Sequence, residues 1–359
     1  MRRIRDAGIT IGTHPTGPRN SIADVDGVTV GHVTLDDGRA KTGVTAILPA
    51  PGNVFRSKLL CGAVVFNGYG KYVGLVQIEE LGTLESPIVL TNTLAIGDAV
   101  RGLVEERLAA DPGIGREAGT FNPVVLECND GVLNDLRALP VRPEHVRDAI
   151  ARAAPDFEQG AVGAGTGMSA YQLKGGIGSA SRTAVVFGRT YTLGGLVLTN
   201  MGRLQDLVVD GRPIGRRLAA ARDAAPPQPD KGSIVLVVAT DAPLSSRQLK
   251  RLARRCLVGI SRTGSHLGHG SGEVALAFST AHRVPHDADA LLSFDFLPDG
   301  QLDLLFEPLV ELVEEAILDS MFLAADTVGR DGNRRDSLAG LLFGPEGFDG
   351  SDGRDGAPC

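Results

Sequence analysis

Ser271 stands between Gly270 and Gly272, directly before the apolar run of residues 274–278. Such a run predicts a buried strand, and the flanking glycines leave the hydroxyl little side-chain cover and let the backbone approach another group closely. A serine placed in this way could attack its own preceding peptide bond and become a new N-terminus. Its freed α-amine, with an unperturbed pKa of about 7.7–8.0, could then act as a general base. Taken alone, the stretch favours a flexible Gly/Ser loop before a strand, because such loops are common.

Other catalytic and binding motifs fit this chain less well. A serine-hydrolase elbow needs glycine two residues before and after the serine, where this chain has His269 and Glu273. A phosphate-binding G-x-x-x-x-G-K-[ST] sequence does not occur. His266 and His269 have no carboxylate or thiol at ligand spacing beside them. We therefore expect a site without a metal or other cofactor.

Two further polar residues follow predicted strands. Glu127 comes directly after the apolar run 124–126 and before a turn sequence, and Asn200 ends the run 191–199. Each is also compatible with an ordinary surface or turn residue. Local sequence alone therefore assigns neither of them to a site.

Several short motifs occur in a fixed order along the chain. They are residues 20–32, Asn-Gly-Tyr-Gly-Lys at 67–71, 85–93, Asn-Asp-Gly-Val-Leu-Asn-Asp at 129–135, Lys-Gly-Gly-Ile-Gly-Ser-Ala-Ser-Arg at 174–182, 239–244, 248–255 and Ser271-Gly272. Together they resemble the self-processing N-terminal serine hydrolases typified by L-aminopeptidase/D-amino-acid esterase-amidases and β-aminopeptidases. The resemblance runs from about Gly8 to Gly332.

The resemblance implies that the chain cleaves itself. Ser271 matches the family's nucleophile, and the bond between Gly270 and Ser271 matches the bond that is cut. Cleavage would leave an α-chain of residues 1–270 and a β-chain of residues 271–359.

The resemblance also implies roles for the other site residues. Asn200 matches an asparagine that helps to stabilise the oxyanion, and Glu127 matches the carboxylate that holds the free amine of the substrate. Asn129 stands where characterised members have an aromatic residue, and we expect it to contact substrate. The family also has a serine and a glutamate, one residue apart, that support the nucleophile before the C-terminal helix. Asp299 aligns with that glutamate, and no serine matches.

Elements that position these residues can be read from the hydrophobic pattern. We expect strands at 28–33, 43–48, 63–66, 88–90, 124–126, 183–187, 191–199, 233–239 and 274–278, and helices from Asn92 or Thr93 to Leu108, at 143–152, after a cap at Ser245 or Ser246, and at 304–323. The family's fold is a four-layer α/β/β/α sandwich. We expect residues 1–343 to form a single catalytic domain, with the Pro-rich stretch 219–231 as a surface loop and 344–359 as a disordered tail.

Composition excludes some function classes and favours others. The net charge of −7 gives no basic surface for nucleic acid or an anionic membrane. No apolar run is long enough to span a membrane, and no apolar segment follows the basic N-terminus, so we expect neither an anchor nor a signal peptide. The four cysteines are scattered, which is typical of reduced thiols in a cytoplasmic protein.

The sequence thus predicts an N-terminal-serine aminopeptidase or amidase. Its substrates would be small peptides, amino-acyl amides or esters with a free α- or β-amine, and the resemblance implies a homotetramer of processed units. Two alternatives stay open. One is an acyltransferase of the ornithine acetyltransferase type, whose members use a threonine nucleophile. The other is a catalytically silent binding protein that keeps the fold.

Overall fold

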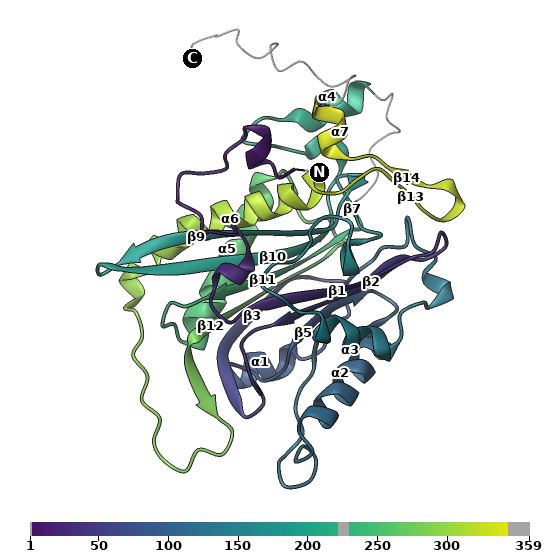
Figure 1. Cartoon of the computed structure of the whole chain (residues 1–359). Helices are drawn as coiled ribbons and strands as arrows, with labels where there is room; N and C mark the ends of the chain where they lie inside the picture. Colours follow the sequence, from purple (N-terminus) through teal and green to yellow (C-terminus); the bar gives the residue numbers. More distant parts are fainter. Residues whose placement is uncertain (1, 222–229, 344–359) are drawn as a thin grey trace.

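The computed structural model describes residues 2–221 and 230–343. Two β-sheets pack face to face, and helices cover the outer face of each (Figure 1). This is the expected α/β/β/α arrangement. The tail 344–359 and residues 222–229 of the Pro-rich stretch lie outside the described residues, and the single catalytic domain stays a prediction.

One sheet has four strands and the other has six. The four-stranded sheet has the order β1 (Thr29–Asp36), β2 (Lys41–Leu48), β5 (Ile88–Asn92) and β6 (Val124–Cys128). The six-stranded sheet has the order β4 (Thr83–Leu84), β3 (Ser57–Gly68), β12 (Gly272–Pro285), β11 (Ser233–Thr240), β10 (Arg189–Asn200) and β9 (Ile177–Val186). Two short pairs complete the strands: β7 (Ser169–Ala170) with β8 (Leu173–Lys174), and β13 (Thr327–Val328) with β14 (Arg334–Arg335).

Helices form the two outer layers. The helices α2 (Ile96–Ala110) and α3 (Pro143–Ala151) pack on the four-stranded sheet, and α5 (Ser246–Arg262) and α6 (Asp303–Phe322) pack on the six-stranded sheet. Three shorter helices are α1 (Leu75–Leu81), α4 (Ile214–Ala221) and α7 (Leu338–Phe343). Apolar side chains fill three cores, one between the sheets and one under each helical layer.

Local sequence explains where several elements begin. Ser245 caps α5 in a capping box with Gln248, as the sequence predicts. Every residue of β11 is buried, because this strand lies inside the sheet with a core on each face. The helix expected from Asn92 or Thr93 begins instead at Ile96. The Asn92 Oδ1 accepts hydrogen bonds from the backbone N–H groups of Leu94 and Ala95, which holds a turn in place of the first helical residues.

Strand lengths differ from the expectation in ways that matter for the site. β12 continues well beyond residue 278, to Pro285, and β3 begins at Ser57 rather than at residue 63. Glu127 lies within β6 instead of following it. Pairing with neighbouring strands extends all three elements beyond their apolar runs.

Candidate active site

Strand register brings Ser271 and Asn200 to the same end of the six-stranded sheet. Asn200 on β10 pairs with Ser233 on antiparallel β11, and Ser233 pairs with Gly272 on parallel β12. Two strand spacings, about 10 Å, therefore separate the backbones at Asn200 and Gly272. The two side chains and a bound carbonyl group can span this gap.

Ser271 is fully buried, and its hydroxyl has no hydrogen-bond partner among the described residues. The carbonyl oxygen of Gly268 accepts hydrogen bonds from the Ser271 N–H (2.9 Å) and from the Asn67 Nδ2 (2.8 Å). On the other side of Ser271, the Gly272 N–H donates to the Gly232 carbonyl (3.0 Å). The backbone is thus held on both sides of the Gly270–Ser271 bond, while the hydroxyl stays without a partner.

The orientation of the Asn200 amide is set by its neighbours. Its Oδ1 accepts a hydrogen bond from the Ser169 N–H (3.0 Å), and its Nδ2 lies 3.4 Å from the Ser233 Oγ. Because the oxygen is engaged by Ser169, the NH₂ group is the end available on the other side. A long contact to Ser233 leaves that group able to donate to a further oxygen.

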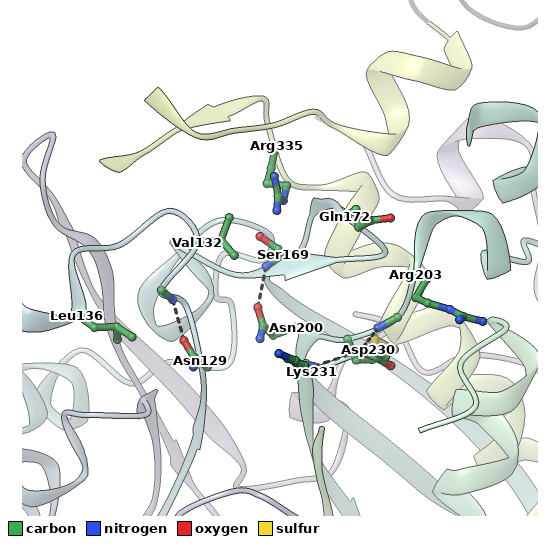
Figure 2. A pocket seen from close by; sticks show the side chains of 14 residues that line it. Asn129, Val132, Leu136, Ser169, Gln172, Asn200, Arg203, Asp230, Lys231 and Arg335 are labelled. Carbon is green, nitrogen blue, oxygen red and sulfur yellow. Dashed lines mark hydrogen bonds between the residues drawn. The ribbon is translucent and has the colours of Figure 1, made fainter. Parts of the chain in front are cut away.

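Asn200 and Asn129 both line a pocket of about 440 Å³ (Figure 2). Figure 2 also shows the hydrogen bond between Ser169 and Asn200, and Asp230 and Lys231 at the same pocket. Asp230 accepts hydrogen bonds from the N–H groups of Gly202 (3.3 Å) and Gly232 (3.1 Å). The pocket therefore begins next to the backbone that pairs with Gly272.

Glu127 is buried in β6, in the sheet that faces β12. Its Oε1 accepts a hydrogen bond from the Lys71 N–H (2.9 Å), and the Lys71 ammonium lies 3.8 Å from the same oxygen. Burial raises the pKa of this carboxyl, and the contacts with Lys71 and the Thr93 hydroxyl only partly oppose the shift. A buried carboxylate of this kind gains most from an additional cation.

Tyr72 lies close to Gly272, the first residue of β12, and its pKa responds to the charge of Glu127. The sequence did not identify this residue. Its hydroxyl lies 2.9 Å from the position that a β-carbon on Gly272 would take, so only glycine fits there without displacing the ring. Burial raises the Tyr72 pKa, and the nearby charges of Cys128, Glu127 and Glu273 raise it further. The hydroxyl has no hydrogen-bond partner among the described residues.

Glu273 is a second residue that the sequence did not single out. It follows Ser271 by two positions, it is fully buried, and neither carboxylate oxygen has a hydrogen-bond partner in the described part of the chain. Burial raises its pKa to about 7, against the opposing effects of the Ser271 hydroxyl and Asn67, which do not reach normal hydrogen-bond geometry. Its position two residues after the candidate nucleophile, at the head of an apolar run, was the available signal.

Asp299, expected beside Ser271, lies elsewhere. It begins a 3₁₀ turn, Asp299–Gln301, and accepts hydrogen bonds from the side chains of Arg247 (2.7 Å) and Gln248 (2.8 Å). Those residues start α5, which follows the far end of β11. β11 and β12 are parallel, so roughly 25 Å of strand separates that end from Ser271. The structure therefore does not bring Asp299 to the nucleophile, because its place along the chain says nothing about which end of the sheet it reaches.

Residues 20–335 match the family model described as Peptidase family S58. This chain belongs to that family. The β-peptidyl aminopeptidase BapA of Sphingosinicella microcystinivorans is 39% identical over 352 residues, which cover 91% of this chain and 86% of that protein.

Solved structures agree with the S58 assignment. The PH0078 protein from Pyrococcus horikoshii OT3 is 50% identical with a TM-score of 0.89, covering 94% of this chain and 96% of that one. The L-aminopeptidase D-Ala-esterase/amidase from Ochrobactrum anthropi, a serine aminopeptidase with a variant of the N-terminal-nucleophile hydrolase fold, is 37% identical with a TM-score of 0.87 and the same coverage.

This S58 protein is therefore a hydrolase of the aminopeptidase and amidase class, as the motifs predict. The acyltransferase and the silent binding protein are not favoured. Within residues 2–221 and 230–343, no group of three or more histidine, cysteine or acidic side chains is arranged to hold a metal ion. No helix in that part of the chain combines the length and apolar character needed to cross a membrane.

Proposed function

We propose that this S58 protein matures by cutting its own Gly270–Ser271 bond and then uses Ser271 as an N-terminal nucleophile. The observation that carries the proposal is the fully buried Ser271 hydroxyl, which has no hydrogen-bond partner among the described residues although the backbone on both sides is held. Buried hydroxyls are normally hydrogen-bonded, and an unpaired one next to a fixed peptide bond suits attack on that bond. The products are an α-chain of residues 1–270 and a β-chain of residues 271–359.

In the cleaved protein, the Ser271 α-amine takes the proton from the Ser271 hydroxyl as the oxygen attacks the substrate carbonyl. It then returns the proton to the leaving amine or alcohol. Asn200 donates its NH₂ group to the developing oxyanion. The hydrogen bond from Ser169 to the Asn200 Oδ1 supports this role, because it turns the donating end of the amide away from Ser169.

The substrate carries a free amine and an amide or ester bond. Glu127 holds the ammonium group, and its raised pKa favours this role because a new cation would stabilise the charged carboxylate. Asn129, which lines the same pocket as Asn200, contacts the substrate near the scissile bond. Relatives named β-peptidyl aminopeptidase and L-aminopeptidase D-Ala-esterase/amidase support peptides, amides and esters of α- or β-amino acids as the substrate class.

Intact-mass measurement and N-terminal sequencing test the maturation step. The purified wild-type protein should give two chains, with the shorter one starting at Ser271, and Ser271→Ala should stay a single chain of 37.5 kDa. The wild type should also hydrolyse a panel of α- and β-amino-acyl anilides that Ser271→Ala leaves intact. Cleavage of Ser271→Ala at the same bond would assign the cut to another protease and contradict the proposal.

Two properties complete the proposal. The protein works in the cytoplasm, which agrees with free thiols at Cys61, Cys128 and Cys256. Cleaved units assemble as a homotetramer, and light scattering after size-exclusion chromatography measures the oligomer directly.

A further inference from the structure

Glu273 and Ser271 form a pair of buried polar groups with unmet hydrogen-bonding capacity. Neither side chain is exposed, and the Ser271 hydroxyl and both Glu273 oxygens have no hydrogen-bond partner among the described residues. Only Gly272 separates them in sequence: Ser271 directly precedes β12, and Glu273 is the second residue of that strand. The Ser271 hydroxyl lowers the pKa of Glu273 against the larger effect of burial, although the two side chains do not reach normal hydrogen-bond geometry.

A structural explanation for Glu273 is weak. A carboxylate that serves only to stabilise a fold is normally paired or hydrogen-bonded, because burying an unpaired charge is costly. Here the charged neighbour that acts on Glu273 is Asp230, a second acid that disfavours its ionisation. The charge of Glu273 in turn raises the pKa of Cys128 and the pKa of Tyr72. The ionised carboxylate is therefore costly at this position, where only the Ser271 hydroxyl and the Asn67 amide favour it among the described residues.

The bond next to this pair is held in place by other residues. Asn67 on β3 donates to the Gly268 carbonyl and pairs in register with Glu273 on β12. The side chain of Lys231 packs beside Gly270, with its Cγ 3.2 Å from where a β-carbon would stand. Both contacts restrain the segment 268–270 that leads into the Gly270–Ser271 bond.

We propose that Glu273 is the general base for self-cleavage at Gly270–Ser271, an inference that rests on the proposed self-processing. An α-amine cannot serve in this first step, because the nitrogen of Ser271 is still part of the peptide bond. The uncleaved chain therefore needs another base, and Glu273 is a buried carboxylate two residues away with no hydrogen-bond partner among the described residues.

Each step balances. The Glu273 carboxylate takes the proton of the Ser271 hydroxyl as the Oγ bonds to the carbonyl carbon of Gly270. The bond from that carbon to the Ser271 nitrogen then breaks, and Glu273 returns the proton to the nitrogen. Water hydrolyses the resulting ester between Gly270 and the Ser271 Oγ, which leaves a C-terminal carboxylate on Gly270 and a free hydroxyl on Ser271.

The Glu273 pKa of about 7 suits this exchange. A base with a pKa near the working pH is ionised often enough to accept a proton and acidic enough, once protonated, to return it. With Asp230, Tyr72 and Cys128 as its titratable neighbours, the rate of self-cleavage should rise with pH through about 7 and then level off.

The test follows newly made full-length chains from cell-free translation, and measures conversion of the intact chain to its fragments over time. Glu273→Gln keeps the shape of the side chain but cannot accept the proton, and it should slow cleavage by about 100-fold or more. Glu273→Asp keeps a carboxylate and should recover part of the rate. Glu80→Gln, an exposed position on α1, is the matched control and should cleave like the wild type.

The possible outcomes distinguish the role of Glu273 from the proposed self-processing on which it rests. A wild-type chain that stays whole would overturn the proposed self-processing itself. A wild type that cleaves together with a Glu273→Gln variant that cleaves equally fast would leave self-processing intact and overturn the role of Glu273. If thermal unfolding shows that Glu273→Gln is not folded, the pH profiles of the wild type and Glu273→Asp decide. Rates that stay flat from about pH 5 to pH 9, a range that brackets neutrality, would also overturn the role.

Discussion

At the scale of single residues, the site depends on buried polar side chains that make one hydrogen bond to a neighbour and keep further hydrogen-bonding capacity unused. Asn200 receives a hydrogen bond from Ser169 at its oxygen, and Glu127 receives one from the Lys71 N–H. Each contact uses part of the side chain's hydrogen-bonding capacity and fixes its direction. The remaining capacity is available to a substrate without any reorganisation of the residue.

Glu127→Gln should reduce kcat/KM for substrates with a free amine by about one and a half to three and a half decades. Truncating one partner of a buried charge pair costs roughly 2–5 kcal/mol, and about 1.4 kcal/mol corresponds to one decade. Steady-state kinetics on an amino-acyl anilide measures the loss. Self-cleavage should persist, because the Gly270–Ser271 bond presents no ammonium to Glu127.

An N-acetylated anilide is the control substrate for Glu127→Gln. It offers no charge to pair, so its already low turnover should change little. Equal losses on the free and the acetylated substrate would show that Glu127 supports the structure or the nucleophile instead.

At the scale of elements, α6 packs directly against the backbone of β9. A β-carbon on Gly178 of β9 would lie 1.9 Å from the Ala316 carbonyl oxygen of α6. The helix and the strand therefore touch backbone to backbone at this point. β9 pairs with β10, the strand that ends at Asn200, so the packing of α6 on β9 fixes the edge of the sheet beside the site.

Gly178→Ala should destabilise the protein by about 1–3 kcal/mol or more, because backbone atoms must move to admit the methyl group. Urea unfolding monitored by circular dichroism gives the change in free energy of unfolding. Gly97→Ala in α2 is the matched control, since its β-carbon would meet no atom within 4 Å. Alanine favours a helix over glycine by up to about 1 kcal/mol, so this control should be neutral or stabilising. Comparable losses in both variants would argue against the close backbone contact.

At the scale of the whole molecule, a buried charge network joins the N-terminal segment to the edge strand β9 and to α6, which packs on it. Arg182 of β9 is fully buried and pairs with Glu311 (3.2 Å) and Glu315 (2.6 Å) of α6. Glu311 also accepts hydrogen bonds from the N–H groups of Thr13 and His14. Glu315 pairs with Arg5 as well (2.6 Å). Residues far apart in the sequence are thereby held against one helix.

The Glu311 carboxyl should make stability depend on pH in the acid range. Burial alone would raise its pKa, but the Thr13 and His14 contacts and Arg182 outweigh burial and lower the pKa to about 2. An unfolded glutamate has a pKa of about 4.3. Since the folded pKa is the lower one, the carboxylate stabilises the fold above about pH 4.3, and this contribution is lost as the pH falls from there toward 2.

Glu311→Gln should therefore cost about 1.5–3 kcal/mol near neutral pH, the range for hydrogen bonds to charged groups. The difference from the wild type should shrink as the pH falls below about 4.3. Urea unfolding at a series of pH values measures both effects. Glu307→Gln, at an exposed position on the same helix, should leave the acid dependence as it is in the wild type. A difference between Glu311→Gln and the wild type that stays constant down to pH 2 would contradict the assigned role.

The sequence by itself determined features that depend on neighbouring residues. The apolar runs predicted β11 and the first part of β12, and the cap at Ser245 predicted α5. Strand burial and helix capping can be predicted in this way because a few adjacent side chains determine them. The ordered motifs gave the family and the four-layer fold. Ser271 and Asn200 were selected because they match positions of the family's motifs, since local sequence alone assigned neither of them to a site.

Tertiary structure alone decided which polar groups meet. Asn67 of β3 bonds to Gly268, 201 residues away in the loop before β12, and no local pattern predicts that contact. The parallel pairing of β11 with β12 sends Asp299 to the far end of the sheet. Burial of Glu273 in the folded protein raises its pKa to about 7, and this carboxylate is two residues from Ser271. Spacing along a chain fixes the face on which a side chain lies, but strand pairing and burial fix its partners and the cost of its charge.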